Sequence, residues 1–124
     1  MENTSKISDS EWEIMKIIWK NPNCTAMDII EQLKDSKKWK PKTVKTLIRR
    51  LIDKNIIGFE QFGREYKYYS LVNEDECRKA ESESFLQKVY NGSLKSMLLN
   101  YIEKENLSKE DIEDLKSILN ERKM

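Results

Sequence analysis

The chain has 124 residues, near the size of one typical domain, and its 23 basic and 22 acidic residues leave a net charge of +1. It contains no histidine, and its three glycines, Gly58, Gly63 and Gly92, are too scattered to cradle a phosphate group. We therefore expect no enzyme, no catalytic constellation and no bound cofactor or metal. No apolar run approaches the roughly 18 residues that cross a membrane, and the polar N-terminus predicts no signal peptide. A soluble, cytoplasmic protein is expected.

The charge is distributed unevenly along the chain. Residues 1–72 contain 14 basic and 10 acidic residues, a net charge of +4, whereas residues 73–124 contain 9 basic and 12 acidic residues, a net charge of −3. A basic half and an acidic half are expected where only the first half meets nucleic acid. We therefore predict a DNA-binding domain over residues 1–72 and a helical dimerisation domain over residues 73–124.

Two short helices are predicted at the start of the basic half. Ser8 and Glu11 have the spacing of a capping box, and an apolar stripe follows until Pro22 interrupts it. Thr25 offers a second cap of the same kind, with Asp28 three residues later. The apolar residues of the two helices are Trp12, Met15, Ile18 and Trp19, then Ala26, Ile29, Ile30 and Leu33.

Residues 37–54 predict a basic helix. This segment contains eight Lys or Arg residues against one acid, Asp53, and Pro41 suits the first helical position. Its apolar residues recur at helical spacing, so one face is expected in the core and the other in solvent. A solvated basic face is the alternative for an isolated helix, but the two helices upstream favour a recognition helix in a helix-turn-helix. Its candidate DNA-binding residues are Lys42, Thr43, Lys45, Thr46, Arg49 and Arg50.

A β-hairpin is predicted directly after the basic helix. Asn55 suits a left-handed helix end, and two strands are expected over residues 56–62 and 65–71. Gly63 and Arg64 form the turn between them. A hairpin in this place is the wing of a winged helix-turn-helix. Arg64 is then either a contact to the sugar-phosphate backbone or an ordinary exposed turn residue.

The acidic half predicts three more helices, which begin near Asn73, Ser93 and Ser108. Fifty-two residues are too few to bury their apolar stripes, so a second copy of the chain is expected to cover them. The alternative is that this half packs only on its own winged domain. Cys24 and Cys77 are isolated in sequence, which indicates reduced, incidental thiols. The expected dimer interface consists of Leu94, Met97, Leu98, Ile102, Ile112, Leu115 and Leu119.

Four segments of the chain resemble the penicillinase-type repressors, the BlaI/MecI family. These are SDSEWEIMKIIWK, WKPKTVKTLIRRLIDKNII, YKYYSLV and SFLQKVYNGSLKSMLLNYIEKENLS, of which the W-x-P-K-T-V-x-T-L block is the most specific. The resemblance covers essentially the whole chain. It implies a dimeric winged-helix repressor on a palindromic operator, which silences genes for a β-lactamase or a resistant penicillin-binding protein.

The resemblance also implies a switch. In the family, derepression follows proteolytic cleavage in the dimerisation region, triggered through a membrane sensor that detects β-lactam. The cut falls between an asparagine and an aromatic residue, which corresponds here to Asn100 and Tyr101. Family members have phenylalanine at the second position, where this chain has tyrosine.

Two alternatives remain from the sequence. A related branch of the family contains copper-responsive repressors with closely spaced C-terminal cysteines, but no cysteine follows Cys77 here. Because Cu(I) coordination by thiolates needs several sulfurs, this absence disfavours a metal sensor. The second alternative is a protein-interaction module whose basic helix binds an acidic partner. A DNA shift assay at several salt concentrations distinguishes the two, since only DNA binding predicts a steep salt dependence.

Overall fold

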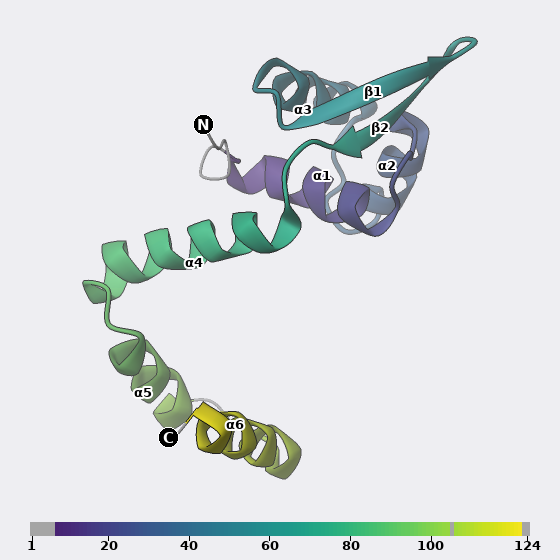
Figure 1. Ribbon diagram of the computed structural model, residues 1–124. Helices are drawn as coiled ribbons and strands as arrows, with labels where there is room; N and C mark the ends of the chain where they lie inside the picture. The colour runs from purple at the N-terminus through teal and green to yellow at the C-terminus, as the bar shows by residue number, and fades with distance from the viewer. Residues whose placement is uncertain (1–6, 105, 123–124) are drawn as a thin grey trace. The chain divides into compact units, whose positions relative to one another are not determined.

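The computed structural model describes residues 7–104 and 106–122, which form a mainly helical fold with one antiparallel hairpin (Figure 1). The elements follow the predicted order. The chain divides into two compact units, the first ending at Ser82 and the second beginning at Glu83. Each unit is described by itself.

The first two helices begin at the predicted caps. At the start of α1 (Asp9–Lys20), the Ser8 Oγ accepts a hydrogen bond from the Glu11 N–H at 3.2 Å, and Glu11 Oε1 accepts one from the Ser8 N–H at 2.9 Å. Thr25 and Asp28 form the same reciprocal pair, at 3.1 and 2.9 Å, before α2 (Ala26–Leu33). Both capping boxes are confirmed, so these helix starts are encoded within four residues.

Helix α3 (Pro41–Asp53) is the predicted basic helix, and it begins at Pro41 without a side-chain cap. Four of its five apolar residues are buried, while Ile52 is only half-buried at the edge of the core. Asn55 has φ = 63°, which confirms the predicted left-handed end. The buried residues of α3 are Val44, Leu47, Ile48 and Leu51.

Strands β1 (Ile57–Phe62) and β2 (Glu65–Ser70) pair antiparallel, with Ile57 opposite Ser70 and Phe62 opposite Glu65. Each strand is one residue shorter than predicted. Ile56 lies outside the ladder because its N–H bonds the Leu51 carbonyl at the end of α3, and its own carbonyl accepts from the Leu71 N–H. The turn contains Gly63 at φ = 64°.

The core of the first unit lies between α1, α2, α3 and the base of the hairpin, and it also includes the start of α4 (Glu74–Tyr90). The side chain of Cys77 is fully buried there. This thiol is a core residue and not the incidental one expected from the sequence. Because Cys77 fixes the start of α4 to this core, the first unit extends to Ser82, beyond the predicted boundary after residue 72.

The second unit contains the end of α4, then α5 (Leu94–Lys104) and α6 (Lys109–Arg122). Asn91 and Gly92 both have positive φ, and the Gly92 N–H bonds the Leu86 carbonyl at 2.9 Å, so α4 ends where the sequence predicted. Ser93 and Ser108 cap the next two helices as predicted. Within the described residues, no side chain of α5 or α6 is buried.

The described helices were also considered for membrane insertion. None of them combines the length and the apolar character that crossing a bilayer requires.

Candidate nucleic-acid interface

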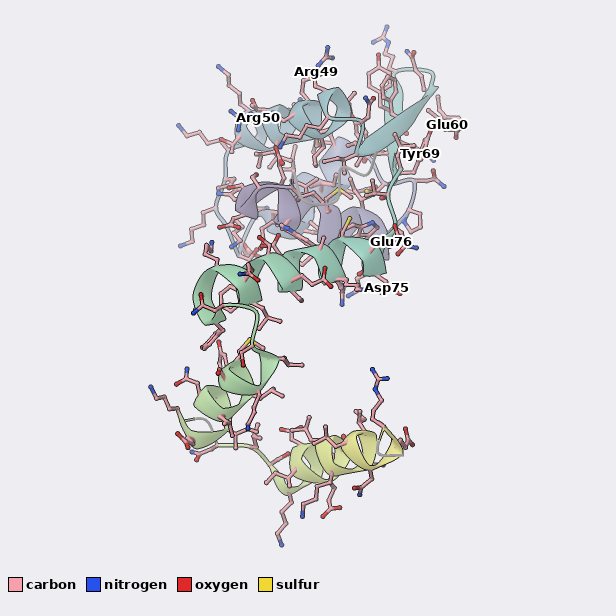
Figure 2. All side chains as sticks on the ribbon, turned by 60° about the vertical axis from the view of Figure 1, so that its left-hand side comes forward. Arg49, Arg50, Glu60, Tyr69, Asp75 and Glu76 are labelled. Atoms are coloured by element: carbon pink, nitrogen blue, oxygen red, sulfur yellow. The ribbon has the colours of Figure 1, made fainter. Side chains whose placement is uncertain are left out.

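The solvent face of α3 presents all six predicted side chains, and each of them is exposed. The four apolar residues listed above hold the opposite face of the helix in the core. Figure 2 shows Arg49 and Arg50 on the outer side of α3. The row combines ammonium and guanidinium groups, which bind phosphates or guanine edges, with hydroxyls that bond either a base or a phosphate.

Two members of this row also interact within α3. The Thr46 hydroxyl donates to the Lys42 carbonyl at 2.9 Å, so its hydrogen is used inside the helix and its oxygen remains as an acceptor. Arg49 Nε lies 3.3 Å from Asp53 Oδ1. Because both side chains of that pair are mostly exposed, the ion pair is weak and competes little with a phosphate.

A groove of about 460 Å³ lies between α3, the start of α2 and the hairpin. It brings Arg64 from the turn together with Lys45 and Arg49 from α3. The sequence placed Arg64 at the hairpin tip but left its surroundings open. The complete lining of the groove is Thr25, Ala26, Met27, Lys45, Ile48, Arg49, Ile52, Phe59, Arg64, Glu65, Tyr66 and Tyr68.

Three large apolar side chains in this groove were not among the predicted site residues. Met27 is 64% exposed, and the rings of Phe59 and Tyr66 are also exposed, with their centroids 5.1 Å apart in an edge-to-face contact. Exposed apolar groups beside cations suit the methyl of thymine. The sequence analysis treated the strand aromatics as packing residues. The signal that identifies them is their place in the register, beside buried Tyr68 but nearer the turn.

A buried ion pair supports the end of α3, and the sequence did not indicate it. Glu11 is only 1% exposed, and its Oε1 lies 2.7 Å from the Lys54 Nζ. The same oxygen accepts the Ser8 N–H, so one carboxylate joins the start of α1 to the end of α3. Burial by itself raises the pKa of Glu11. The hydrogen bonds from Lys54 and Ser8 and the charge of Lys54 outweigh it, and the net pKa is lowered.

The hairpin has its own supports. Trp19 Nε1 donates to Ser70 Oγ at 3.0 Å, and that hydroxyl donates to the Val72 carbonyl at 2.7 Å. The Tyr68 N–H donates to the Cys24 carbonyl at 2.8 Å, so the segment before α2 also bonds β2. Because α1, α2 and α3 share one core with the base of the hairpin, the groove has rigid walls.

The thiols do not form a metal or redox site. Burial, and secondarily the charge of Asp28, raises the pKa of the Cys24 thiol, so it is protonated at neutral pH. Across residues 7–104 and 106–122, no three His, Cys, Asp or Glu side chains are grouped as metal ligands.

Comparison with known proteins places these features in a family. The family model described as penicillinase repressor matches residues 7–121. The methicillin resistance regulatory protein MecI of Staphylococcus aureus is 44% identical over 123 residues, covering 98% of this chain and 100% of that protein. The penicillinase repressor of Bacillus licheniformis is 39% identical over 123 residues, covering 99% of this chain and 96% of that protein.

A solved structure agrees with the fold of the first unit. It is the monomeric form of Bacillus licheniformis BlaI in complex with the blaP half-operator, with 34% identity and a TM-score of 0.53. The match covers 61% of this chain and 93% of that one. The hairpin beside α3 is therefore the wing of a winged helix-turn-helix. Because the family model and both relatives span nearly the whole chain, this protein belongs to the penicillinase repressor family of DNA-binding transcriptional repressors, which are not enzymes.

Proposed function

We propose that this protein is a cytoplasmic homodimeric repressor that binds a palindromic operator through α3 and the wing. The observation that carries this proposal is the groove that unites Lys45 and Arg49 of α3 with Arg64 of the wing. It continues the exposed basic row of α3, so one strand of a duplex meets cations from two elements while the exposed helix face enters the major groove. Lys42, Thr43, Thr46 and Arg50 complete the proposed contact surface.

The second unit supplies the proposed dimer interface. Its apolar side chains are exposed in the single chain, among them Leu94, Leu98 and Ile102 of α5. A groove of about 410 Å³ between α5 and α6 is lined mainly by apolar groups, including Leu115 and Leu119 of α6. Exposed apolar surface of this extent is typical of a protein interface. A second copy also supplies the second recognition helix that a palindrome requires.

The regulated genes and the switch are proposed from family membership. The relatives named above are a methicillin resistance regulator and a penicillinase repressor, which supports β-lactamase or penicillin-binding-protein genes as targets. Release from DNA is then proteolysis between Asn100 and Tyr101, initiated by a membrane sensor of β-lactam. Asn100 and Tyr101 lie in α5, within the proposed interface, so a cut there divides the apolar surface.

The test of the operator proposal is a DNA shift assay over a range of salt concentrations. If each monomer neutralises about four phosphates, the logarithm of the affinity falls against the logarithm of the salt concentration with a slope of about −7. A slope near −2 contradicts the proposal and favours a protein-interaction module. Lys45→Glu is expected to abolish binding. The matched control is Lys79→Glu on α4, where an exposed lysine outside the groove undergoes the same charge change.

A further inference from the structure

The side chain of Asn100 is bonded to the end of the preceding helix. Its Nδ2 donates to the hydroxyl oxygen of Tyr90 at 3.1 Å. Tyr90 is the last residue of α4, is half-buried, and has its ring 6.2 Å from that of Phe85. The bond therefore spans the tight turn at Asn91 and ties the second turn of α5 back to α4.

Cleavage in the middle of a helix requires that the helix opens. A protease acts on a flexible, opened segment, and Asn100 lies inside α5 (Leu94–Lys104), with helix on both sides. When opening and closing are fast, the cleavage rate follows the population of the open form. No described side chain of α5 is buried, so its opening depends on few contacts. The cap at Ser93 and the bond to Tyr90 are two of these.

We propose that Tyr90 is a latch on the scissile segment: its hydroxyl holds the Asn100 amide, restrains α5 and withholds that amide from an endopeptidase that selects asparagine before the cut. This inference rests on the proposed cleavage between Asn100 and Tyr101. In that hydrolysis the Asn100–Tyr101 peptide C–N bond breaks, water supplies the new carboxylate oxygen, and its protons pass to the Tyr101 amine and the medium. Tyr90 is a positioning residue and takes no part in the bond cleavage.

The test removes one hydroxyl from the full-length chain. Tyr90→Phe retains the ring that packs on Phe85 and deletes the acceptor of the Asn100 amide. Digestion with an asparagine-specific endopeptidase, followed by mass spectrometry, measures the cut after Asn100. We expect Tyr90→Phe to be cut there about fivefold faster than wild type, the population change that corresponds to one net hydrogen bond.

An internal control is the cut after Asn120, an exposed asparagine in α6 of the same unit. The rate ratio of the cuts after Asn100 and Asn120 is expected to rise about fivefold, and sedimentation is expected to show the same oligomeric state for both proteins. Equal acceleration at both sites indicates general loosening of the unit and overturns the latch. An unchanged rate after Asn100 overturns it as well.

Amide hydrogen exchange separates the latch from the proposed switch. The exchange of α5 is expected to accelerate in Tyr90→Phe while that of α1 and α3 is unchanged, whether or not cells cut this chain at Asn100. If repressor recovered from β-lactam-treated cells is intact at Asn100, the switch proposal fails, but faster α5 exchange still supports the latch. Unchanged α5 exchange refutes the latch and leaves the switch proposal standing.

Discussion

At the scale of single residues, the exposed row on α3 contains two kinds of side chain with different expected roles. Thr43 and Lys45 lie two positions apart, and both are exposed. A hydroxyl is short and directional and suits a base edge, whereas a lysine is a long, flexible point charge and suits a phosphate. Lys45 also lines the groove that contains Arg64, which places it on the side of the wing.

Substitution of these two residues is expected to separate sequence reading from phosphate binding. Thr43→Ala should reduce the preference for the operator over single-base variants by about 1 kcal/mol or more. Lys45→Ala should weaken all sequences alike and make the salt slope shallower by about 1. Binding to an operator series at several salt concentrations measures both effects. The opposite pattern would exchange the two roles.

The ion pair of Glu11 and Lys54 gives a prediction for stability. Lys54→Met leaves the carboxylate buried without its ammonium partner, and because Lys54 is 34% exposed we expect a loss of about 2–3 kcal/mol, below the range for fully buried pairs. Urea unfolding measures this loss. Adding Glu11→Gln to Lys54→Met should recover part of it, since no uncompensated charge then remains. A double variant less stable than Lys54→Met would contradict this account.

The same pair predicts a pH dependence. The folded-state pKa of Glu11 lies below the ordinary value of 4.5, so its stabilising contribution is complete above that pH and is lost as the pH falls through the folded-state pKa. The free energies of unfolding of wild type and Glu11→Gln should therefore converge below about pH 4.5. A difference that stays constant down to pH 3 argues against a charged Glu11.

At the scale of elements, α5 contrasts with α3. Helix α3 buries its apolar face within its own unit, whereas the apolar side chains of α5 are exposed or half-buried. Both helices show helical spacing of apolar residues, so periodicity alone does not say what covers them. In α3 the first unit covers them, and in α5 we propose that a second copy does.

A charge on the apolar face of α5 is expected to dissociate the dimer. Leu98→Glu would bury an unpaired carboxylate in the proposed interface, at a cost of several kcal/mol. Sedimentation at micromolar concentration should then show a monomer. Ser96→Glu is the matched control, because it adds the same charge to α5 at the third helical position, where glutamate completes a capping box with Ser93. An intact Leu98→Glu dimer would place the interface elsewhere.

At the scale of the whole molecule, the chain consists of a unit with a continuous core and a unit without buried side chains in α5 and α6. The first unit contains every proposed DNA-binding residue, and the second contains every proposed dimer residue. The two functions are therefore carried by different units, and operator binding depends on the second unit through the linkage of two half-site contacts.

A fragment of residues 1–100 tests this dependence. It retains the first unit with its complete core, so its thermal unfolding should remain cooperative. It loses the apolar residues of α6 and the end of α5, so it should be monomeric. Affinity for the palindrome should fall steeply, because the second half-site contact loses an effective concentration in the millimolar range. A dimeric fragment that binds as tightly as the full chain would exclude cleavage here as the release mechanism.

Features encoded within a few residues were determined by the sequence. The capping boxes at Ser8 and Thr25, the left-handed end at Asn55 and the turn at Gly63 were all predicted correctly. Each depends on a short span of backbone geometry, in which the chemistry of one or two side chains decides the conformation. The division of α3 into a core face and a basic face follows from helical periodicity in the same way.

Features that join distant segments were decided only by the tertiary structure. Glu11 and Lys54 are 43 residues apart, so no local pattern pairs them. The burial of Cys77 depends on how α4 meets the core formed by earlier elements, and the meeting of Arg64 with Lys45 depends on where the wing lies beside α3. Such contacts arise from packing, which selects among locally equivalent arrangements by the volume filled and the charges compensated.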